Sequence, residues 1–512
     1  MTRVAIAASS DISAQAGAEL AHEGGSAVDA VLGAALVSMC TDIGIMSPGG
    51  GALVTIWPPD GNPVVIDGCP EMPGRGQPIG RRGEAMWEVV FDYGGETHQR
   101  IGFGSVATPG AFAALAEASR RFGSLPWSTV MRPAIRWVKD GFPLGGGAAE
   151  YLRYTHEAIY SWSEESFRLL HHDDGSPLAE GDTVFIPGLA DSLEEIASQG
   201  VEALYHGALG QRIAAGVQTA GGLLGEADLA AYRASTHQPI TLEFGGWRVA
   251  TCPPPSVGGP CLAAMLHFLK ACPEHEINTD AVRWLVRAQH AVLDYRARKL
   301  DGAEERFPEE VQSLLALAQS GEPSRLLSAP STIHISGVDN TGLACSLTAS
   351  AGYGSGAIAP GTGLWLNNSL GEIDLHPQGL AGVAPGTRLV SNMAPTVARS
   401  ADGAVLAIGS PGASRITTAI AQSMWHHIFF GENLDAAIEH PRLHVELFAE
   451  ASNVAYERGL PVTPVHGFKL REFDGLAMYF GGVQAARWSA TDGFAAVADT
   501  RRSGGISYGG EP

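Results

Sequence analysis

The sequence predicts a globular protein of mixed helices and strands, and three observations carry that prediction. Hydrophobic residues make up 45% of the 512 residues and charged residues 17%, so burial can outweigh conformational entropy. Polar and apolar residues alternate over 332–339 and again over 346–350, which is the period of a half-polar strand. Ala, Val and Leu instead surround the whole circumference of 27–40, which is typical of a helix buried between layers.

The other elements follow in chain order. Strands are expected at 4–8, 52–57, 64–67 and 241–252, with a turn and a strand over 361–368. Helices are expected at 13–22, 110–122, 127–141, 190–198, 207–219, 226–232, 262–271, 281–300 and 416–429. Residues 304–330 are charged and flanked by proline, which indicates an exposed link. The glycines 49–51 fit either the tight start of a strand or a close backbone approach to a ligand.

The two half-polar segments form a predicted hairpin. A three-residue loop at Asn340-Thr341-Gly342 sets Thr332 opposite Ser350, His334 opposite Thr348 and Ser336 opposite Ser346. A two-residue loop would turn half of these hydroxyls toward the apolar face. The hairpin therefore gathers hydroxyl groups on one side.

Composition excludes several classes of function. Lys and Arg number 33 against 54 Asp and Glu, and the resulting net charge of -21 repels phosphate backbones and anionic lipid surfaces. The six cysteines show no metal-ligand spacing, which disfavours structural zinc and suggests a reducing compartment. The apolar run among the first ten residues is shorter than the core expected of a signal peptide, and no window approaches 18 apolar residues. We therefore expect a cytoplasmic protein without nucleic-acid or membrane partners.

The common catalytic motifs are absent as well. The chain has no P-loop, no dinucleotide fingerprint and no H-E-x-x-H, so neither a cofactor nor a metal is expected. The one G-x-S-x-G string, 505–509, stands too near the end of the sequence for the helix that a nucleophile elbow requires. A hydroxyl-bearing strand after a loose link fits another design, in which cleavage before a threonine frees an α-amine that serves as the base.

At this point the sequence resembles the γ-glutamyltranspeptidase-like N-terminal nucleophile hydrolases. The resemblance is collinear over nearly the whole chain, through 15–17, 24–30, 48–51, 108–110, 221–232, 253–259, 366–368, 393–396 and 409–415. It implies a four-layer αββα sandwich that cuts itself between Ser331 and Thr332. The products would be a large subunit, 1–331, and a small subunit, 332–512, of the same precursor, with a dimer of such heterodimers as a further expectation.

The resemblance also implies the catalytic residues. Thr332 would be the nucleophile and Ser350 the hydroxyl that supports it. Gly412 and Ala413 match the pair of residues whose backbone N–H groups form the oxyanion hole.

The substrate-binding positions depart from the family. Cys69 stands where the family has an arginine that grips the γ-glutamyl carboxylate, and a thiol cannot replace that bidentate contact. The family's paired serines become Ser391 and Asn392, and its N-N-Q-M-D-D segment continues here with Ser369 and ends on Glu372. Compensation for the lost arginine could come from three nearby positions, Arg75, Arg81 and Arg388.

We therefore expect an autoprocessing threonine hydrolase or acyltransferase whose small-molecule substrate is not a simple γ-glutamyl amide. The alternatives are an ordinary γ-glutamyltransferase or glutathione hydrolase, and a C–C bond hydrolase that removes an oxalyl group in alkylproline-type secondary metabolism. A further alternative is an uncleaved, non-catalytic binding homologue.

Overall fold

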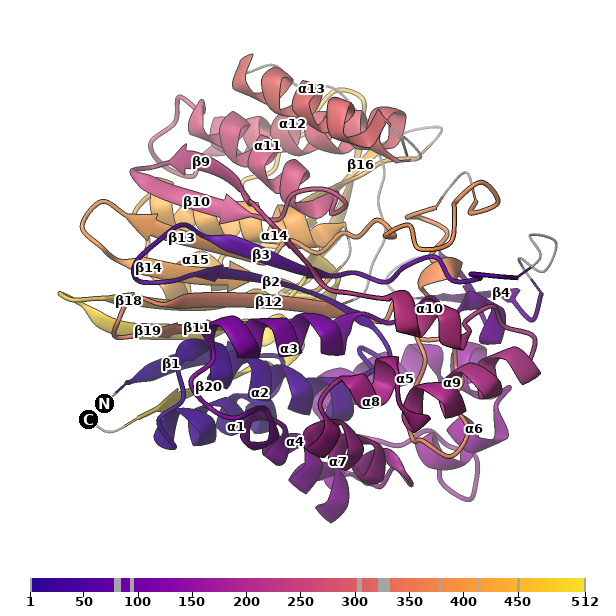
Figure 1. The fold of residues 1–512 in the computed structure, drawn as a ribbon. Helices are drawn as coiled ribbons and strands as arrows, with labels where there is room; N and C mark the ends of the chain where they lie inside the picture. The colour runs from indigo at the N-terminus through magenta and orange to yellow at the C-terminus, as the bar shows by residue number, and fades with distance from the viewer. Residues whose placement is uncertain are drawn as a thin grey trace.

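Two antiparallel sheets lie face to face at the centre of the molecule, with helices on both outer faces (Figure 1). The computed structural model describes residues 2–77, 84–92, 96–301, 306–320, 332–376, 379–412, 414–448 and 452–510. No helix within these ranges is long and apolar enough to span a bilayer. The layers follow the αββα order that the resemblance implies.

The first sheet has seven strands, and the predicted hairpin forms its centre. In spatial order they are β20 (Gly505–Gly509), β1 (Val4–Ala8), β11 (Ile333–Asp339), β12 (Ala344–Ser350), β2 (Gly51–Trp57), β3 (Val64–Gly68) and β8 (Ser235–His237). The second sheet has six strands: β19 (Gly493–Ala498), β18 (Gln484–Ser489), β14 (Val405–Gly409), β13 (Thr396–Ser400), β10 (Trp247–Thr251) and β9 (Ile240–Phe244). Small side chains such as Ala5, Ala250 and Ala407 fill the space between them.

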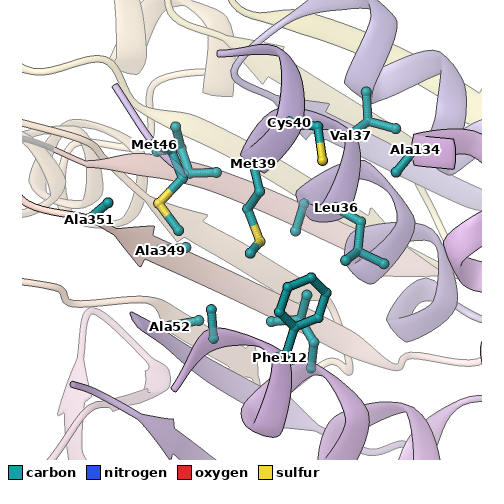
Figure 2. Packing of buried hydrophobic residues seen from close by; sticks show 14 of the residues in the cluster. Leu36, Val37, Met39, Cys40, Met46, Ala52, Phe112, Ala134, Ala349 and Ala351 are labelled. Atoms are coloured by element: carbon teal, nitrogen blue, oxygen red, sulfur yellow. The ribbon is translucent and has the colours of Figure 1, made fainter. Parts of the chain in front are cut away.

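The first helical layer covers the outer face of the seven-stranded sheet. It consists of α1 (Asp11–His22), α2 (Ala27–Thr41) and α3 (Ala111–Phe122), and α4 (Trp127–Asp140) packs against α2. Every residue of α2 is buried, as its uniform apolar surface predicts. Figure 2 shows Met39 of α2 and Phe112 of α3 packed over Ala52 and Ala349 of the sheet.

Asp29 explains why α2 begins where it does. Its carboxylate accepts the backbone N–H of Ser26, at 2.8 Å, in a capping box. The same carboxylate accepts the backbone N–H groups of Ser124 and Leu125, at 2.8 and 3.2 Å. One side chain thus caps α2 and also fixes the loop between α3 and α4.

The second helical layer corrects one sequence prediction. It consists of α11 (Gly258–Lys270), α12 (Thr279–Tyr295), α13 (Phe307–Ser320) and α14 (Arg415–Met424). Residues 304–330 were expected to be an exposed link, but α13 buries Phe307, Val311 and Leu314 against this layer. The 3.6-residue spacing of these side chains outweighs the charge of the segment. Residues 302–305 and 321–331 lie outside the described ranges.

Two further predictions were wrong in detail. Residues 241–252 form a hairpin, β9 and β10, because Gly245 and Gly246 both adopt positive φ and reverse the chain. Residues 364–368 make only isolated bridges, Leu366 with Gly49 and Trp365 with Ile358, since asparagine side chains hold this segment in place of a strand ladder.

The remaining elements lie around this core. They are α5 (Gly146–Thr155), α6 (Glu164–Leu170), α7 (Leu189–Gln199), α8 (Glu202–Tyr205), α9 (Ala208–Thr219), α10 (Glu226–Ala231), α15 (Leu434–Glu439) and the π-turn η7 (Trp425–Phe429). Short sheets are formed by β4 (Trp87–Asp92) with β5 (Glu96–Ile101), by β6 (Phe142–Pro143) with β7 (Thr183–Val184), and by β15 (Leu443–Glu446), β16 (Ser452–Glu457) and β17 (Phe468–Phe473).

Candidate active site

Thr332 stands immediately before β11, at the end of the central hairpin. The predicted register is confirmed: His334 pairs with Thr348, Ser336 pairs with Ser346, and the three-residue loop contains Gly342 at φ +86°. Continuing that register by one step sets Thr332 opposite Ser350. Thr332 is only 2% exposed, and both residues line one cavity of about 20 Å³.

The other hydroxyl groups of the hairpin bind the second sheet. The Ser346 hydroxyl donates to the carbonyl oxygen of Ile408 at 3.0 Å and accepts the backbone N–H of Thr396 at 2.9 Å. The Thr55 hydroxyl of β2 donates to the carbonyl oxygen of Pro395 at 2.8 Å. Most hydroxyl groups on this face of the hairpin thus connect the two sheets. Thr332 and Ser350 lie at the end of the hairpin that borders the cavity.

His334 lies at the centre of this polar face, and its tautomer follows from its neighbours. The Ser336 hydroxyl donates its hydrogen to the carbonyl oxygen of Gln484 at 3.1 Å, so it can only accept from His334 Nε2, at 2.8 Å. The ring Nδ1 then accepts from the Thr348 hydroxyl, also at 2.8 Å. Burial lowers the pKa of His334 to about 3, so the imidazole is neutral.

The structure brings four of the predicted substrate-binding residues to the Thr332 cavity. Its polar lining beyond Thr332 and Ser350 consists of Ser369, Glu372, Ser391 and Asn392. Apolar side chains, including Leu375 and Leu389, complete the wall. Desolvation, with a smaller contribution from the charge of Asp374, raises the pKa of the half-buried Glu372 to about 8. Glu372 is therefore mainly an uncharged carboxyl group at pH 7.

The side chain of Asn367 holds the segment that carries Ser369. Asn367 Oδ1 accepts the backbone N–H groups of Ser369 and Ala107, both at 3.0 Å, and its Nδ2 donates to the carbonyl oxygen of Gly49 at 2.7 Å. A Cβ on Gly49 would lie 2.6 Å from the carbonyl oxygen of Trp365. The glycines at 49–51 thus allow the chain's own backbone to approach closely, beside the cavity.

Arg296 sets the orientation of Asn392, and the sequence analysis did not identify it. This arginine is 2% exposed, and its Nη1 donates to Asn392 Oδ1 at 2.5 Å while its Nε donates to Asp301 at 3.0 Å. Because a guanidinium only donates, the oxygen of the Asn392 amide is the atom that faces Arg296. The signal was an arginine one turn after Val292, directly after the end of α12, where the apolar stripe of that helix would continue with an apolar residue.

Cys69 has a different environment from the other predicted substrate-binding residues. It is fully buried in an apolar cluster with Leu53, Val65, Cys252 and Met393, while its neighbour Pro70 lines the cavity. Burial raises the pKa of the Cys69 thiol well above its usual range, so the thiol is neutral.

Arg388 binds the backbone of Cys69. Its Nη1 donates to the Cys69 carbonyl oxygen at 2.9 Å, its guanidinium lies 3.6 Å from Asp67 and 3.4 Å from Glu71, and it stacks on Tyr232. These contacts hold Arg388 beside Asp67, Glu71 and Tyr232, and it is not among the residues that line the cavity. Arg75 is likewise paired with Glu71 and Asp228, and Arg81 lies outside the described ranges. The described lining of the cavity therefore contains no cationic side chain.

Gly412 lies in a tight turn between β14 and α14. Its φ is +122°, and a Cβ would lie 3.0 Å from the Cα of Gly481. The Ser410 hydroxyl, which accepts the backbone N–H of Gly482 at 3.1 Å, supports the turn. A residue other than glycine would be strained at Gly412. Ala413 lies outside the described ranges.

Among the described residues, one cluster of metal-capable side chains follows α14 in the chain. His426, Glu432 and His440 bring ligand atoms within 4.8 Å of one another. However, the rings of His426 and His440 are stacked with centroids 3.8 Å apart, and His426 Nδ1 lies 3.0 Å from Glu432. Ring lone pairs lie in the ring plane, so two stacked imidazoles do not converge on one ion. The cluster is held by stacking and hydrogen bonding.

The αββα fold is that of the N-terminal nucleophile hydrolases. Cephalosporin acylase from Bacillus halodurans has the same fold, with a TM-score of 0.81 and 24% identity over 99% of this chain and 96% of that chain.

The chain belongs to the gamma-glutamyltranspeptidase family, whose model matches residues 13–509. It is 27% identical to a glutathione hydrolase proenzyme of Bacillus subtilis (strain 168), over 98% of this chain and 90% of the relative. It is 30% identical to the acylase ACY 1 proenzyme of Pseudomonas sp. (strain V22), over 85% and 81%. The chain is accordingly an enzyme of this hydrolase and transferase family.

Proposed function

We propose that the chain is an autoprocessing N-terminal threonine hydrolase that attacks the carbonyl group of a small acyl substrate other than a simple γ-glutamyl amide. The observation that carries the proposal is the cavity in which Thr332 and Ser350 meet Ser369, Glu372, Ser391 and Asn392 without a cationic side chain in its described lining.

Processing requires only the chain itself and water. The Thr332 hydroxyl attacks the carbonyl carbon of Ser331, and the peptide nitrogen leaves, so that an ester replaces the peptide bond. Water then hydrolyses the ester, which gives a carboxylate on Ser331 and a free α-amine on Thr332. Such amines have pKa values near 8, so a useful fraction is neutral at pH 7.

The same two groups of Thr332 then act on the substrate. The α-amine takes the hydroxyl proton while Oγ1 attacks the acyl carbon, and Ser350 supports the hydroxyl from the adjacent strand. Backbone N–H groups at Gly412 and Ala413 stabilise the oxyanion. The protonated amine gives its proton to the leaving group, and water hydrolyses the acyl ester to restore Thr332.

The lining argues for an acyl group unlike γ-glutamyl. A γ-glutamyl group carries an ammonium and a carboxylate on one carbon, and each needs an opposite charge when water is excluded. Asn392 is a neutral amide, and Glu372 with its pKa of about 8 supplies little negative charge at pH 7. Together with the volume of about 20 Å³, this favours a short acyl group with neutral hydrogen-bond acceptors.

Autoprocessing is tested by electrophoresis of the purified chain. The wild type is expected to give fragments 1–331 and 332–512, with Thr332 as the new N-terminal residue by sequencing. Thr332→Ala is expected to stay full length, and Thr341→Ala, in the exposed loop of the same hairpin, is the matched control and is expected to be cut. A wild type that stays uncut after prolonged incubation would leave a binding homologue as the better description.

Substrate class is tested on the processed enzyme with p-nitroanilides of short acyl groups, such as oxamoyl and acetyl, beside γ-glutamyl-p-nitroanilide. We expect kcat/KM for the γ-glutamyl compound to be at least about 100-fold lower than for the best short acyl group, because its charges remain unpaired in the site. Efficient γ-glutamyl turnover that Thr332→Ala abolishes would show an ordinary γ-glutamyltransferase.

A further inference from the structure

The turn after β14 contains a buried backbone N–H group without a partner. It belongs to Gly412, which is buried, and no acceptor among the described residues receives it. Buried N–H groups in native proteins are nearly always paired, so an unpaired one is a candidate donor to a ligand. The preceding residue, Pro411, lines a small cavity together with Thr332, so the turn lies beside the proposed nucleophile.

The direction of the Gly412 N–H group follows from the carbonyl group of Pro411. The two groups belong to one peptide unit, which is trans and planar, so they point in opposite directions. The Ser410 hydroxyl donates to the Pro411 carbonyl oxygen at 2.7 Å. A contact that holds this carbonyl group therefore also orients the N–H group of Gly412.

The neighbours of the Ser410 hydroxyl leave one use for its single hydrogen. Ser410 is fully buried, and its oxygen accepts the backbone N–H of Gly482 at 3.1 Å. Because that N–H group can only donate, the hydroxyl hydrogen goes to the Pro411 carbonyl oxygen. A Cβ on Gly481 would lie 2.7 Å from Ser410 Oγ and 3.0 Å from the Pro411 oxygen. The turn at 481–482 thus packs closely on both atoms of this hydrogen bond.

The turn at 481–482 is itself held by charged side chains on either side. The Asp499 carboxylate accepts the backbone N–H of Val483 at 2.8 Å. Arg415 donates to the carbonyl oxygen of Tyr479 at 3.1 Å, and its guanidinium stacks on the ring of that tyrosine. The backbone that packs on the serine hydroxyl therefore has a fixed position.

We propose that Ser410 is a positioning residue for the oxyanion hole: by holding the Pro411 carbonyl oxygen, its hydroxyl aims the Gly412 N–H group at the negative oxygen of the tetrahedral intermediate. This inference rests on the proposed function, which assigns that N–H group to the hole. In the reaction, Thr332 Oγ1 bonds to the acyl carbon, its proton passes to the α-amine, and the electron pair of the C=O bond moves onto the oxygen. The C=O bond then forms again and the leaving group departs with its electron pair. Ser410 takes no part in these bonds.

The test compares two esters that differ in the atom that becomes negative. In p-nitrophenyl acetate this atom is oxygen, and in its thiono analogue it is sulfur, which is larger and a weaker hydrogen-bond acceptor. A correctly aimed N–H group favours the oxygen ester, and a misdirected one loses part of that preference. The readout is the ratio of kcat/KM for the two esters on the processed enzyme, in which the fraction of active protein cancels.

Ser410→Ala is expected to lower kcat/KM for p-nitrophenyl acetate about 10–100-fold and the ratio about tenfold, because oxyanion donors act in the transition state. Ser410→Cys keeps a weak donor and acceptor and is expected to give an intermediate ratio, which carries the test if Ser410→Ala is not cut.

The matched control is Thr362→Val, at another fully buried hydroxyl with the same two kinds of partner. The Thr362 hydroxyl donates to the carbonyl oxygen of Ala359 at 2.7 Å and accepts the backbone N–H of Leu364 at 3.2 Å. Thr362 is not among the residues that line either cavity at Thr332. The control is expected to lower the melting temperature and keep the wild-type ratio.

The outcomes separate this inference from the function on which it rests. If the wild type is not cut, or if Thr332→Ala is acylated equally fast, the proposed function fails. If the wild type is cut and acylated at Thr332 but the Ser410 variants keep its ratio, the role of Ser410 alone is overturned. Lower activity of these variants at an unchanged ratio would show a purely structural role, which also overturns it.

Discussion

Glu372 offers the sharpest test of the electrostatics of the cavity. We consider Glu372→Gln, which keeps the shape of the side chain and removes its ability to ionise. The pKa of Glu372 is raised from 4.5 to about 8 by desolvation and by Asp374. The folded chain therefore keeps a proton between these pH values that the unfolded chain has lost.

The sign of the effect follows from that proton. Stability falls with rising pH wherever the folded state binds more protons, so the wild type should lose stability between about pH 4.5 and 8 because of Glu372. At 1.36 kcal/mol per pH unit, the full displacement corresponds to at most about 5 kcal/mol. Because Glu372 is only half-buried and Asp374 is exposed, solvent screening reduces this to about 2 kcal/mol.

The assay is urea unfolding at several pH values from 4.5 to 8, in a Thr332→Ala background so that a single chain unfolds. Glu372→Gln should match its parent near pH 4.5 and exceed it by about 2 kcal/mol near pH 8. The exposed Glu276→Gln serves as the control and should track its parent throughout. A difference between Glu372→Gln and its parent that stays constant over this range would refute the raised pKa.

Three more outcomes are expected. Gly409→Ala would set a Cβ 2.2 Å from the ring of His334, which is held at both nitrogens, so urea unfolding should show a loss of about 1–3 kcal/mol, whereas Gly475→Ala, with open space around it, should be nearly neutral. Arg501→Met leaves the buried carboxylate of Glu457 without its cation, while Asp499 keeps Arg442, and should cost about 3–5 kcal/mol; a loss below 1 kcal/mol would contradict the pairing. Arg296→Lys cannot serve both of its partners, so KM for the best short acyl p-nitroanilide should rise about fivefold at constant kcat, and an unchanged KM would argue against its orienting role.

The central hairpin could be predicted because two local signals agreed. The alternation of polar residues fixed which side chains share a face, and Gly342 fixed the length of the loop, so the register followed. What lies opposite that face is a long-range property. Only the structure shows that Ser346 and Ser336 serve the contact between the sheets, since their partners are backbone carbonyl groups of the second sheet brought close by folding.

The errors have the same origin. Charged residues made 304–330 look exposed, although α13 needs only one apolar stripe to pack. The sequence showed that a cysteine, Cys69, replaces the family's arginine. It could not show which residues Arg388 contacts, because its partners Asp67 and Glu71 are distant in the chain. Arg296 was overlooked because positioning residues lie behind the cavity and belong to no local motif.

The strand order has a consequence for a chain cut before Thr332. In the seven-stranded sheet, β20, β11 and β12 would come from the C-terminal fragment and β1, β2, β3 and β8 from the N-terminal one, so β1 would lie between two strands of the other fragment. The two fragments would share one sheet, and neither could leave without exposing unpaired strand edges. Cleavage would therefore leave the folded molecule intact. Unfolding of the cleaved protein would instead release two chains, and refolding would become a second-order reaction that depends on concentration.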